Sequence, residues 1–211
     1  MGFTRFCNAF VKITGWPVQF FAFRTKIFYE DRSVQGRKIQ GPAILVSNHT
    51  SVYDYAVYIF VFITRTLRVV MAEVLFEKPL LGWFLRSLGG IKVDRNTHDF
   101  GFVAEAEAVL AKGGVVGIFP ESRLPKEGEE RPLPFKDSAA YIALRSGAPV
   151  IPVVTDGSYF RRKRAHVLIG KPIDLRALSA GLTEKEAVQA ATKAMRDTII
   201  DLKSKLNEMV L

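Results

Sequence analysis

The feature of this sequence that most constrains its fold is an alternation, from Ala43 onward, of short apolar runs with stretches of helical character. The apolar runs have the length and composition of buried strands. Strands that alternate with helices favour an α/β domain, in which a central, largely parallel or mixed sheet is flanked by helices. The expected strands are 43–47, 67–71, 90–93, 115–119, 150–155 and 166–169, and the expected helices are 51–64, 79–88, 100–112 and 138–146.

The 211 residues fit a single domain, because the chain has no internal repeat, low-complexity tract or clear linker. With 48% hydrophobic and 24% charged residues, its composition is that of a globular protein. The lone cysteine, Cys7, excludes an internal disulfide framework and a cysteine-based zinc cluster. Thr183 and Glu186 have capping-box spacing, and apolar residues then recur at steps of three and four. We expect a C-terminal helix there, and one folded domain over residues 31–211.

Residues 1–30 hold nine of the 24 aromatic residues of the chain, interleaved with basic side chains. Aromatic rings beside cations suit a helical segment in the membrane interface, with its charges on anionic lipid. The alternative is an ordinary helix that packs its aromatic face on the core. No stretch reaches the about 20 apolar residues that a membrane-spanning helix needs, and the first apolar run lacks a signal-peptide cleavage site. We expect a peripheral protein on the cytoplasmic face of the membrane, without a transmembrane span.

The chain is basic, with 30 lysines and arginines against 21 aspartates and glutamates, a net charge of +9 and an isoelectric point near 9.7. This balance favours an anionic partner: nucleic acid, an anionic membrane surface or a phosphorylated substrate. The basic run at 161–164 fits a nucleic-acid or lipid contact, although such runs are usually solvated loops. Charge alone does not choose between these partners.

Three polar clusters share one position relative to the expected strands. Asn48-His49 follows the strand 43–47, Asp94-Arg95 follows 90–93, and Glu121 to Arg123 follow 115–119. Ligands of open α/β sheets bind beyond the carboxyl ends of the strands. If these strands are parallel neighbours, the three clusters converge on one crevice.

His49 and Asp54 form the sharpest pair in these clusters. With His49 on a loop and Asp54 in the first turn of a helix, the carboxylate can fix the imidazole tautomer and stabilise its protonated form. The other ring nitrogen is then free to take a proton from a hydroxyl. The alternative is structural, because Ser51 and Asp54 also have capping-box spacing.

Arg95 and Arg123 are candidates for phosphate recognition, since the planar guanidinium matches phosphate oxygens. Each is also a candidate for an ordinary surface ion pair. Glu121 can orient a substrate hydroxyl or hold an arginine. No glycine-rich nucleotide loop, metal-ligand spacing or nucleophile elbow is present, so we expect general-base chemistry without a metal.

Four blocks in order make the sequence resemble the glycerolipid acyltransferases, especially the lysophosphatidic acid acyltransferase family. Residues 48–54, Asn-His-Thr-Ser-Val-Tyr-Asp, are similar to the family's NHxSxxD block. Residues 89–95 resemble the block that ends in Asp-Arg, and residues 119–123 resemble the Phe-Pro-Glu-Gly block. Residues 148–153 resemble the fourth block, a proline-containing apolar strand.

The resemblance implies that residues 31–211 are an acyltransferase domain with His49 and Asp54 as catalytic residues. His49 would be the general base on an acceptor hydroxyl that attacks an acyl thioester, with Asp54 orienting it. The implied substrate-binding residues are Asn48, Arg95, Glu121, Ser122 and Arg123. No bound cofactor is implied; acyl-CoA or acyl-[acyl carrier protein] is the co-substrate.

The third block departs from the family pattern in two ways. Ser122 stands where the family usually has glycine, and Arg123 comes one residue earlier than in the commonest form. Ser138 also replaces a glycine, in a following Phe-Lys-x-Gly-like segment. If either glycine serves a positive φ angle, serine is strained there.

The leading hypothesis is a peripheral membrane enzyme that acylates lysophosphatidic acid to phosphatidic acid in phospholipid biosynthesis. An acyltransferase with another lipid acceptor is the near alternative. A non-catalytic basic protein that binds lipid or nucleic acid is a different class, although no nucleic-acid motif is present and we expect no nucleic-acid partner. A lipid hydrolase is disfavoured, because nothing identifies a nucleophile or a water-activating metal.

Overall fold

The computed structural model describes residues 2–94, 100–160 and 164–211. In these residues seven strands form one mixed sheet of order β1-β7-β6-β2-β5-β3-β4, which confirms the expected fold class. All neighbours are parallel except β6 and β7. The strands are β1 Lys26–Tyr29, β2 Ala43–Ser47, β3 Leu67–Ala72, β4 Ile91–Val93, β5 Val115–Ile118, β6 Val150–Thr155 and β7 His166–Ile169.

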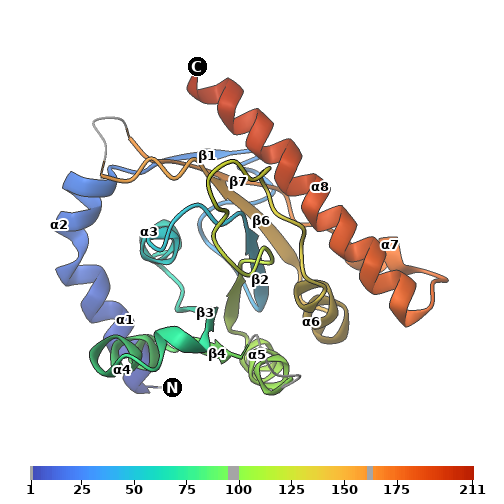
Figure 1. Cartoon of the computed structure of the whole chain (residues 1–211), viewed down its shortest axis with the longest axis horizontal. Coiled ribbons are helices and arrows are strands. Elements are labelled where there is room, and N and C mark those ends of the chain that lie inside the picture. The colour runs from blue at the N-terminus through green and yellow to red at the C-terminus, as the bar shows by residue number, and fades with distance from the viewer. Residues whose placement is uncertain (1, 95–99, 161–163) are drawn as a thin grey trace.

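Helices cover both faces of the sheet (Figure 1). On one side lie α5, α6 and α8, and on the other lie α3 and the N-terminal helices, with α4 beside α1. The helical elements are α1 Gly2–Thr14, α2 Trp16–Val18, a π-helix Gln19–Phe23, α3 Asp54–Val61, a 3-10 turn Glu73–Leu75, α4 Pro79–Leu88, α5 Gly101–Ala111, α6 Ser138–Ser146, α7 Leu175–Ser179 and α8 Glu184–Val210.

The core forms two apolar clusters, one on each face of the sheet. Strand β2 is buried at every residue because β5 and β6 flank it and helices cover both of its faces. Helix α8 opens with the predicted capping box: Thr183 Oγ1 accepts from Glu186 N, and the Glu186 carboxylate accepts from Thr183 N. Its apolar stripe, which includes Met195, Ile199 and Leu202, packs on β6 and β7.

The N-terminal segment does more than the sequence indicated. Its last residues form the edge strand β1, which runs parallel to β7. Phe23, at the end of the π-helix, is buried in the core. The first helices therefore lead directly into the sheet. In the described part of the chain, no helix combines the length and the apolar character needed to cross a bilayer.

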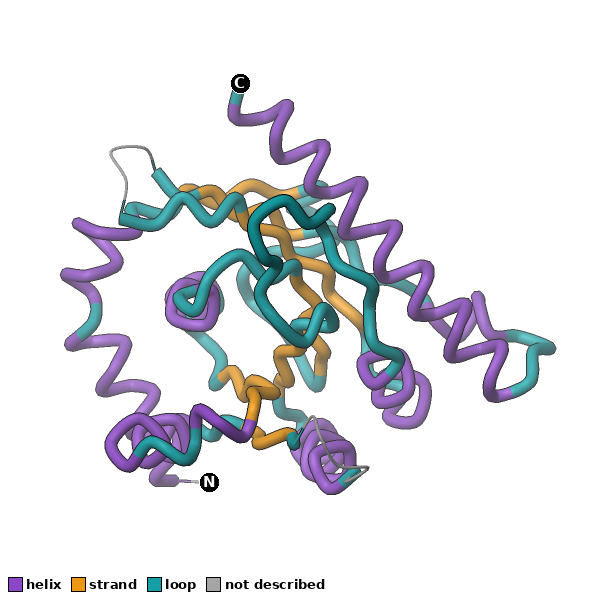
Figure 2. Tube along the Cα trace, viewed as in Figure 1, coloured by secondary structure: helices purple, strands orange, loops and turns teal. Residues whose placement is uncertain are grey.

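The connection from β5 to α6, residues 119–137, passes in front of the strands as a long loop (Figure 2). It lies over the carboxyl ends of the central strands, on the side from which α8 approaches. This loop carries the third sequence block, so the fold brings that block close to the end of β2.

Candidate active site

His49 and Asp54 face each other at the carboxyl end of β2. His49 follows the strand on a loop, and Asp54 is the first residue of α3. The distance from His49 Nδ1 to Asp54 Oδ2 is 2.9 Å. The Asp54 side chain is fully buried, whereas 19% of the His49 side chain is exposed. The pair therefore has the geometry of an imidazole held by a carboxylate, with the ring still open to solvent.

Asp54 also makes one of the two bonds that the Ser51 capping-box spacing allowed, because its carboxylate accepts from Ser51 N at 3.0 Å. Helix α3 itself begins at Asp54, and its N-cap residue Tyr53 makes no side-chain capping hydrogen bond. The Asp54 carboxylate further accepts from Thr50 N at 2.7 Å and Thr50 Oγ1 at 2.8 Å. These bonds fold residues 49–53 into a loop, which is why α3 begins three residues later than expected.

Tyr159 supplies a further donor to Asp54 that sequence reasoning missed. Its hydroxyl donates to Asp54 Oδ1 at 2.7 Å from the β6–β7 connection. Burial, reinforced by the negative charge of Asp54, raises the pKa of Tyr159 far above its usual value, so the phenol keeps its proton. No motif marks Tyr159, because 105 residues separate it from its partner.

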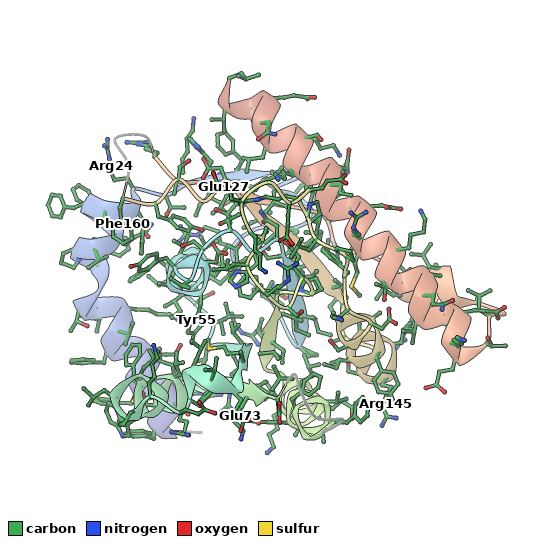
Figure 3. All side chains as sticks on the ribbon, viewed as in Figure 1. Arg24, Tyr55, Glu73, Glu127, Arg145 and Phe160 are labelled. Carbon is green, nitrogen blue, oxygen red and sulfur yellow. The ribbon has the colours of Figure 1, made fainter. Side chains whose placement is uncertain are left out.

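The Tyr159 ring joins this network to the N-terminal segment. It packs edge-on against Phe23, with ring centroids 5.5 Å apart. The next residue, Phe160, contacts both Phe23 and Tyr53 and donates its backbone N–H to Ala22 O. Figure 3 shows Phe160 beside Arg24, where the N-terminal helices end. The hydrogen-bond network around Asp54 is therefore packed, through Tyr159, against the segment that precedes β1.

Glu121 and Asn48 hold the backbone around His49. Glu121 is buried; its Oε1 accepts from His49 N and its Oε2 from Leu133 N, each at 2.8 Å. Asn48 is also buried and exchanges two hydrogen bonds with the backbone of Thr155, at 2.9 and 3.0 Å. These side chains lock the loops at the ends of β2, β5 and β6, and the geometry gives them a positioning role.

The imidazole of His49 lies against an aromatic ring. Its centroid is 4.4 Å from that of Phe119, and the two ring planes are inclined by only 24°. Phe119 in turn stacks on Tyr58 of α3, at 6.1 Å. One face of the imidazole is thus covered, and the ring can turn little without losing these contacts.

The two serines that replace glycines differ in backbone conformation. Ser122 has φ +59°, in the left-handed region that favours glycine, so the predicted strain exists at this position. Ser138 is the first residue of α6 and is not among the positive-φ residues. The departure at Ser138 therefore carries no such cost.

Arg123 is engaged in a surface ion pair. Its guanidinium donates to both carboxylate oxygens of Glu129, at 2.7 and 2.8 Å. Hydrogen bonds from Arg123 and from the Lys126 amide lower the pKa of Glu129 to about 2. The cluster of Asp94 and Arg95 follows β4 at the far edge of the sheet, where β5 and β3 separate it from β2. Arg95 itself lies outside the described residues.

A small cavity of about 120 Å³ adjoins His49. It is below the about 300–1,000 Å³ of a typical ligand cleft, and so suits a compact polar group. Arg131 from the β5–α6 connection and Lys203 from α8 line it, and neither has an ion-pair or hydrogen-bond side-chain partner among the described residues. Sequence reasoning missed both cations, since no motif surrounds them.

A second histidine–carboxylate pair lies near this cavity. His166 Nδ1 is 2.8 Å from Asp156 Oδ2, and Asp156 Oδ1 also accepts from the backbone amides of His166 and Ser158. The sequence suggested no partner for His166. These bonds close the connection between β6 and β7, which gives the pair a local structural role. Among described residues, no group of three histidine, cysteine or acidic side chains is placed to hold a metal ion.

Comparison with known proteins gives consistent matches. A family model described as Acyltransferase matches residues 21–156. The chain is 29% identical over 140 residues to 1-acyl-sn-glycerol-3-phosphate acyltransferase of Bacillus subtilis, covering 64% of this chain and 68% of that protein. It is 27% identical over 203 residues to 1-acyl-sn-glycerol-3-phosphate acyltransferase beta of Homo sapiens, covering 91% and 72%. The solved 1-acyl-sn-glycerophosphate (LPA) acyltransferase PlsC of Thermotoga maritima shares the fold, with a TM-score of 0.67, 21% identity, and coverage of 95% and 81%.

Proposed function

The chain belongs to the Acyltransferase family and is an acyltransferase. From this premise we propose that it transfers an acyl chain from an acyl thioester to the free hydroxyl of lysophosphatidic acid, giving phosphatidic acid. The proposed acceptor is supported by the names of the relatives, 1-acyl-sn-glycerol-3-phosphate acyltransferases. Family membership removes the non-catalytic binding protein from consideration. The alternative is an acyltransferase with a different lipid acceptor, and the assay below distinguishes the two by comparing acceptors.

The observation that carries the proposed mechanism is the contact of His49 Nδ1 with the buried Asp54 carboxylate. With Nδ1 directed at the carboxylate, Nε2 is the nitrogen left to act as general base. The acceptor hydroxyl gives its proton to Nε2 while its oxygen attacks the carbonyl carbon of the thioester. The C–O ester bond forms and the C–S bond breaks. The leaving thiolate then takes from the imidazolium the proton that the acceptor hydroxyl had given to it.

Asp54 remains ionised throughout this cycle in the proposed mechanism. Its charge stabilises the imidazolium that exists between the two proton transfers. The donors from Thr50, Ser51 and Tyr159 hold the carboxylate in place, so that the histidine does not have to be reoriented during the reaction.

Recognition of the acceptor phosphate is assigned to the cations around the cavity beside His49. Arg131 and Lys203 line this cavity from two different elements, together with the carboxylates of Glu121 and Asp156. Both carboxylates already accept hydrogen bonds from the protein, Glu121 from two backbone amides and Asp156 from His166, whereas the two cations are left to a phosphate group. Arg123 lies on the same loop as Arg131, but it joins the phosphate only if Glu129 releases it. The proposed acyl donor, a co-substrate, is acyl-CoA or acyl-[acyl carrier protein].

The proposal includes peripheral association with the cytoplasmic face of the membrane, through the N-terminal segment of residues 1–30. The aromatic face of α1 is open, with Phe3, Phe6 and Phe10 each more than half exposed. Had this helix packed its aromatic face on the core, these rings would be buried. Large exposed rings beside basic residues favour insertion into the headgroup region. Helix α4 adds Leu80 and Trp83, which are also exposed.

The catalytic proposal is tested by thiol release from acyl-CoA, with and without lysophosphatidic acid. We expect release to depend on the acceptor and to fall by about 100- to 10,000-fold in His49→Ala. His166→Ala is the matched control, because His166 also contacts a carboxylate but does not itself line the cavity beside His49. At saturating acceptor it should keep the wild-type kcat, and any effect through Asp156, which does line the cavity, should be confined to the KM for the acceptor.

Other outcomes of this assay have distinct meanings. Full activity in His49→Ala would contradict the assignment of the base. Release without acceptor would indicate a thioesterase. If no thiol is released, the assay is repeated with acyl-[acyl carrier protein] and a panel of lysolipids, and turnover there identifies the donor and acceptor.

Membrane association is tested separately by flotation with liposomes. Phe6→Ser/Phe10→Ser should reduce the floated fraction, because these rings are the proposed lipid contacts. Ile200→Ser/Met209→Ser removes two exposed apolar side chains from α8 instead and should float like the wild type. Equal flotation of all three proteins would contradict the interfacial role of α1.

A further inference from the structure

A larger hollow lies at the opposite end of the sheet, where β2, β3 and β5 begin. This groove has a volume of about 850 Å³ and is bounded by α1, α5 and the start of β3. It is separate from the cavity beside His49, which lies at the carboxyl ends of the strands. Its wall carries one carboxylate, Glu105, and five cations: Arg5, Lys12, Arg65, Arg68 and Lys112.

Lys12 and Arg65 are fixed in this wall by backbone carbonyls. Lys12 Nζ donates to Ile63 O at 2.9 Å and to Arg65 O at 2.6 Å. The Arg65 guanidinium donates to Ile39 O at 2.8 Å and to Gly113 O. Burial lowers the pKa of Lys12 to about 8, so a positive charge there is costly until an anion is near. These two cations keep their place without a carboxylate partner.

The remaining cations are available to a ligand. Arg5, Arg68 and Lys112 have no ion pair or side-chain hydrogen bond with any described residue. They come from α1, β3 and the end of α5, and they meet at one groove only in the folded chain. Five cations against one carboxylate make this groove strongly electropositive, which favours an anion.

A buried acceptor adds a second requirement on the ligand. Asn8 lines the same groove and is only 2% exposed. Its Nδ2 donates to Thr4 O and Leu88 O, both at 3.0 Å, but its Oδ1 has no hydrogen-bond partner in the described structure. A buried polar atom without a partner calls for an explanation, and a hydroxyl or ammonium donor on the ligand supplies one.

The position of the groove on α1 brings it close to the lipid headgroups if α1 lies in the membrane interface. Helix α1 turns Thr4, Asn8 and Lys12 toward the groove, while its exposed rings Phe6 and Phe10 lie on a different face. An interfacial helix buries its apolar face about 5–10 Å into the boundary between headgroups and acyl chains. The opposite side of such a helix is then level with the phosphates and polar groups of neighbouring lipids.

We propose that this groove binds the headgroup of an anionic phospholipid, with the cations on its phosphodiester and Asn8 on a hydroxyl. The inference rests on the membrane association proposed above, but not on the acyl-transfer chemistry at His49. The bound lipid is a structural anchor and not the reacting acceptor, because the sheet separates the groove from the catalytic histidine.

The test compares binding to vesicles of phosphatidylcholine alone with binding to vesicles that also contain phosphatidylglycerol. The variant is Arg68→Gln/Lys112→Gln, and the matched control is Lys185→Gln/Lys193→Gln, which removes the same charge from the exposed surface of α8. Each basic residue near an anionic surface contributes about 1 kcal/mol, so we expect the groove variant to bind anionic vesicles about 10- to 30-fold more weakly. The control should bind like the wild type.

Several results would overturn the proposal. An equal loss in both double variants would mean general attraction between a basic protein and an anionic surface. A matching loss on phosphatidylcholine vesicles would mean that α1 no longer inserts. Displacement of the wild type, but not of the groove variant, by millimolar inorganic phosphate would assign the groove to a free phosphate ion.

Two further measurements complete the design. Phosphatidylmethanol carries the same phosphodiester charge without a headgroup hydroxyl, so the wild type should bind it more weakly than phosphatidylglycerol. Equal binding would contradict the role of Asn8. Acyl transfer in detergent micelles should be unchanged in the groove variant. Failure of the proposed lipid site can therefore be told apart from failure of the proposed catalytic function.

Discussion

Asp54 holds His49 and the loop around it with the same carboxylate: Oδ2 lies 2.9 Å from His49 Nδ1 and also accepts from two backbone amides. Catalytic orientation and loop structure are therefore coupled in one buried group. A substitution at Asp54 should change both turnover and stability, whereas a substitution at His49 should change mainly turnover.

We predict that Asp54→Asn lowers kcat by about 10³- to 10⁴-fold, because an amide neither fixes the imidazole nor stabilises its charge. The same substitution should lower the free energy of unfolding by about 1–3 kcal/mol, since an amide N–H₂ would face donors that need an acceptor. Steady-state kinetics and urea denaturation measure the two effects. Loss of activity with unchanged stability would show that the loop does not depend on Asp54.

Tyr159 is a positioning residue, and we predict that Tyr159→Phe lowers kcat by about 5- to 10-fold with KM unchanged. The estimate follows from a hydrogen bond to a charged group, which contributes about 1.5–3 kcal/mol, part of it to stability. Tyr55→Phe is the control, because the Tyr55 hydroxyl donates to Leu67 O at 3.3 Å and does not contact Asp54. Equal kcat values in the two variants would remove Tyr159 from the catalytic network.

Substitution of the two serines by glycine should change stability in opposite directions. Ser122→Gly removes the strain of a left-handed backbone at a residue with a side chain. The extra entropy of glycine in the unfolded chain offsets part of this gain, so the free energy of unfolding should rise by about 0.5–1 kcal/mol. Ser138→Gly places glycine in the first turn of α6 and should lower it by about 0.5 kcal/mol. Denaturant melts of both variants measure the changes, and a shared sign would contradict this account.

Binding to anionic vesicles should weaken as the pH rises from 7 to 9.5. The pKa of Lys12 is about 8, lowered by burial, so Lys12 is protonated below this pH and loses its charge above it. A neutral Lys12 attracts the phosphodiester less, and a bound lipid shifts the loss of charge to higher pH. The floated fraction, measured at a series of pH values and at fixed ionic strength, reports the effect.

Lys12→Met provides the control for this pH dependence. The guanidinium groups of Arg5, Arg65 and Arg68 stay charged over this range, and Lys112 and Glu105 face the groove in both proteins. The other titratable groups of the chain are common to wild type and variant. The difference between the two curves therefore reports Lys12. Parallel curves would show that Lys12 does not contact the bound headgroup.

Local patterns in the sequence were sufficient for most of the secondary structure. Strand β2 and helices α4 and α6 have the predicted bounds, because apolar periodicity marks their interiors and glycines in the left-handed conformation end both helices. Strand β1 was not predicted, since its four residues are only partly buried and their pairing comes from β7, which lies far along the chain.

The residues of the candidate site also fall into two groups, those that the sequence predicted and those that it did not. His49 and Asp54 were predictable because five residues separate them, and a loop that leads into a helix suffices to bring them together. Tyr159, Arg131 and Lys203 come from distant segments, and only the order of strands in the sheet and the packing of α8 place them near His49. A linear pattern records which backbone conformation each segment prefers. Which distant side chains meet depends on burial of the whole sheet between its two layers of helices, and the tertiary structure alone decided that.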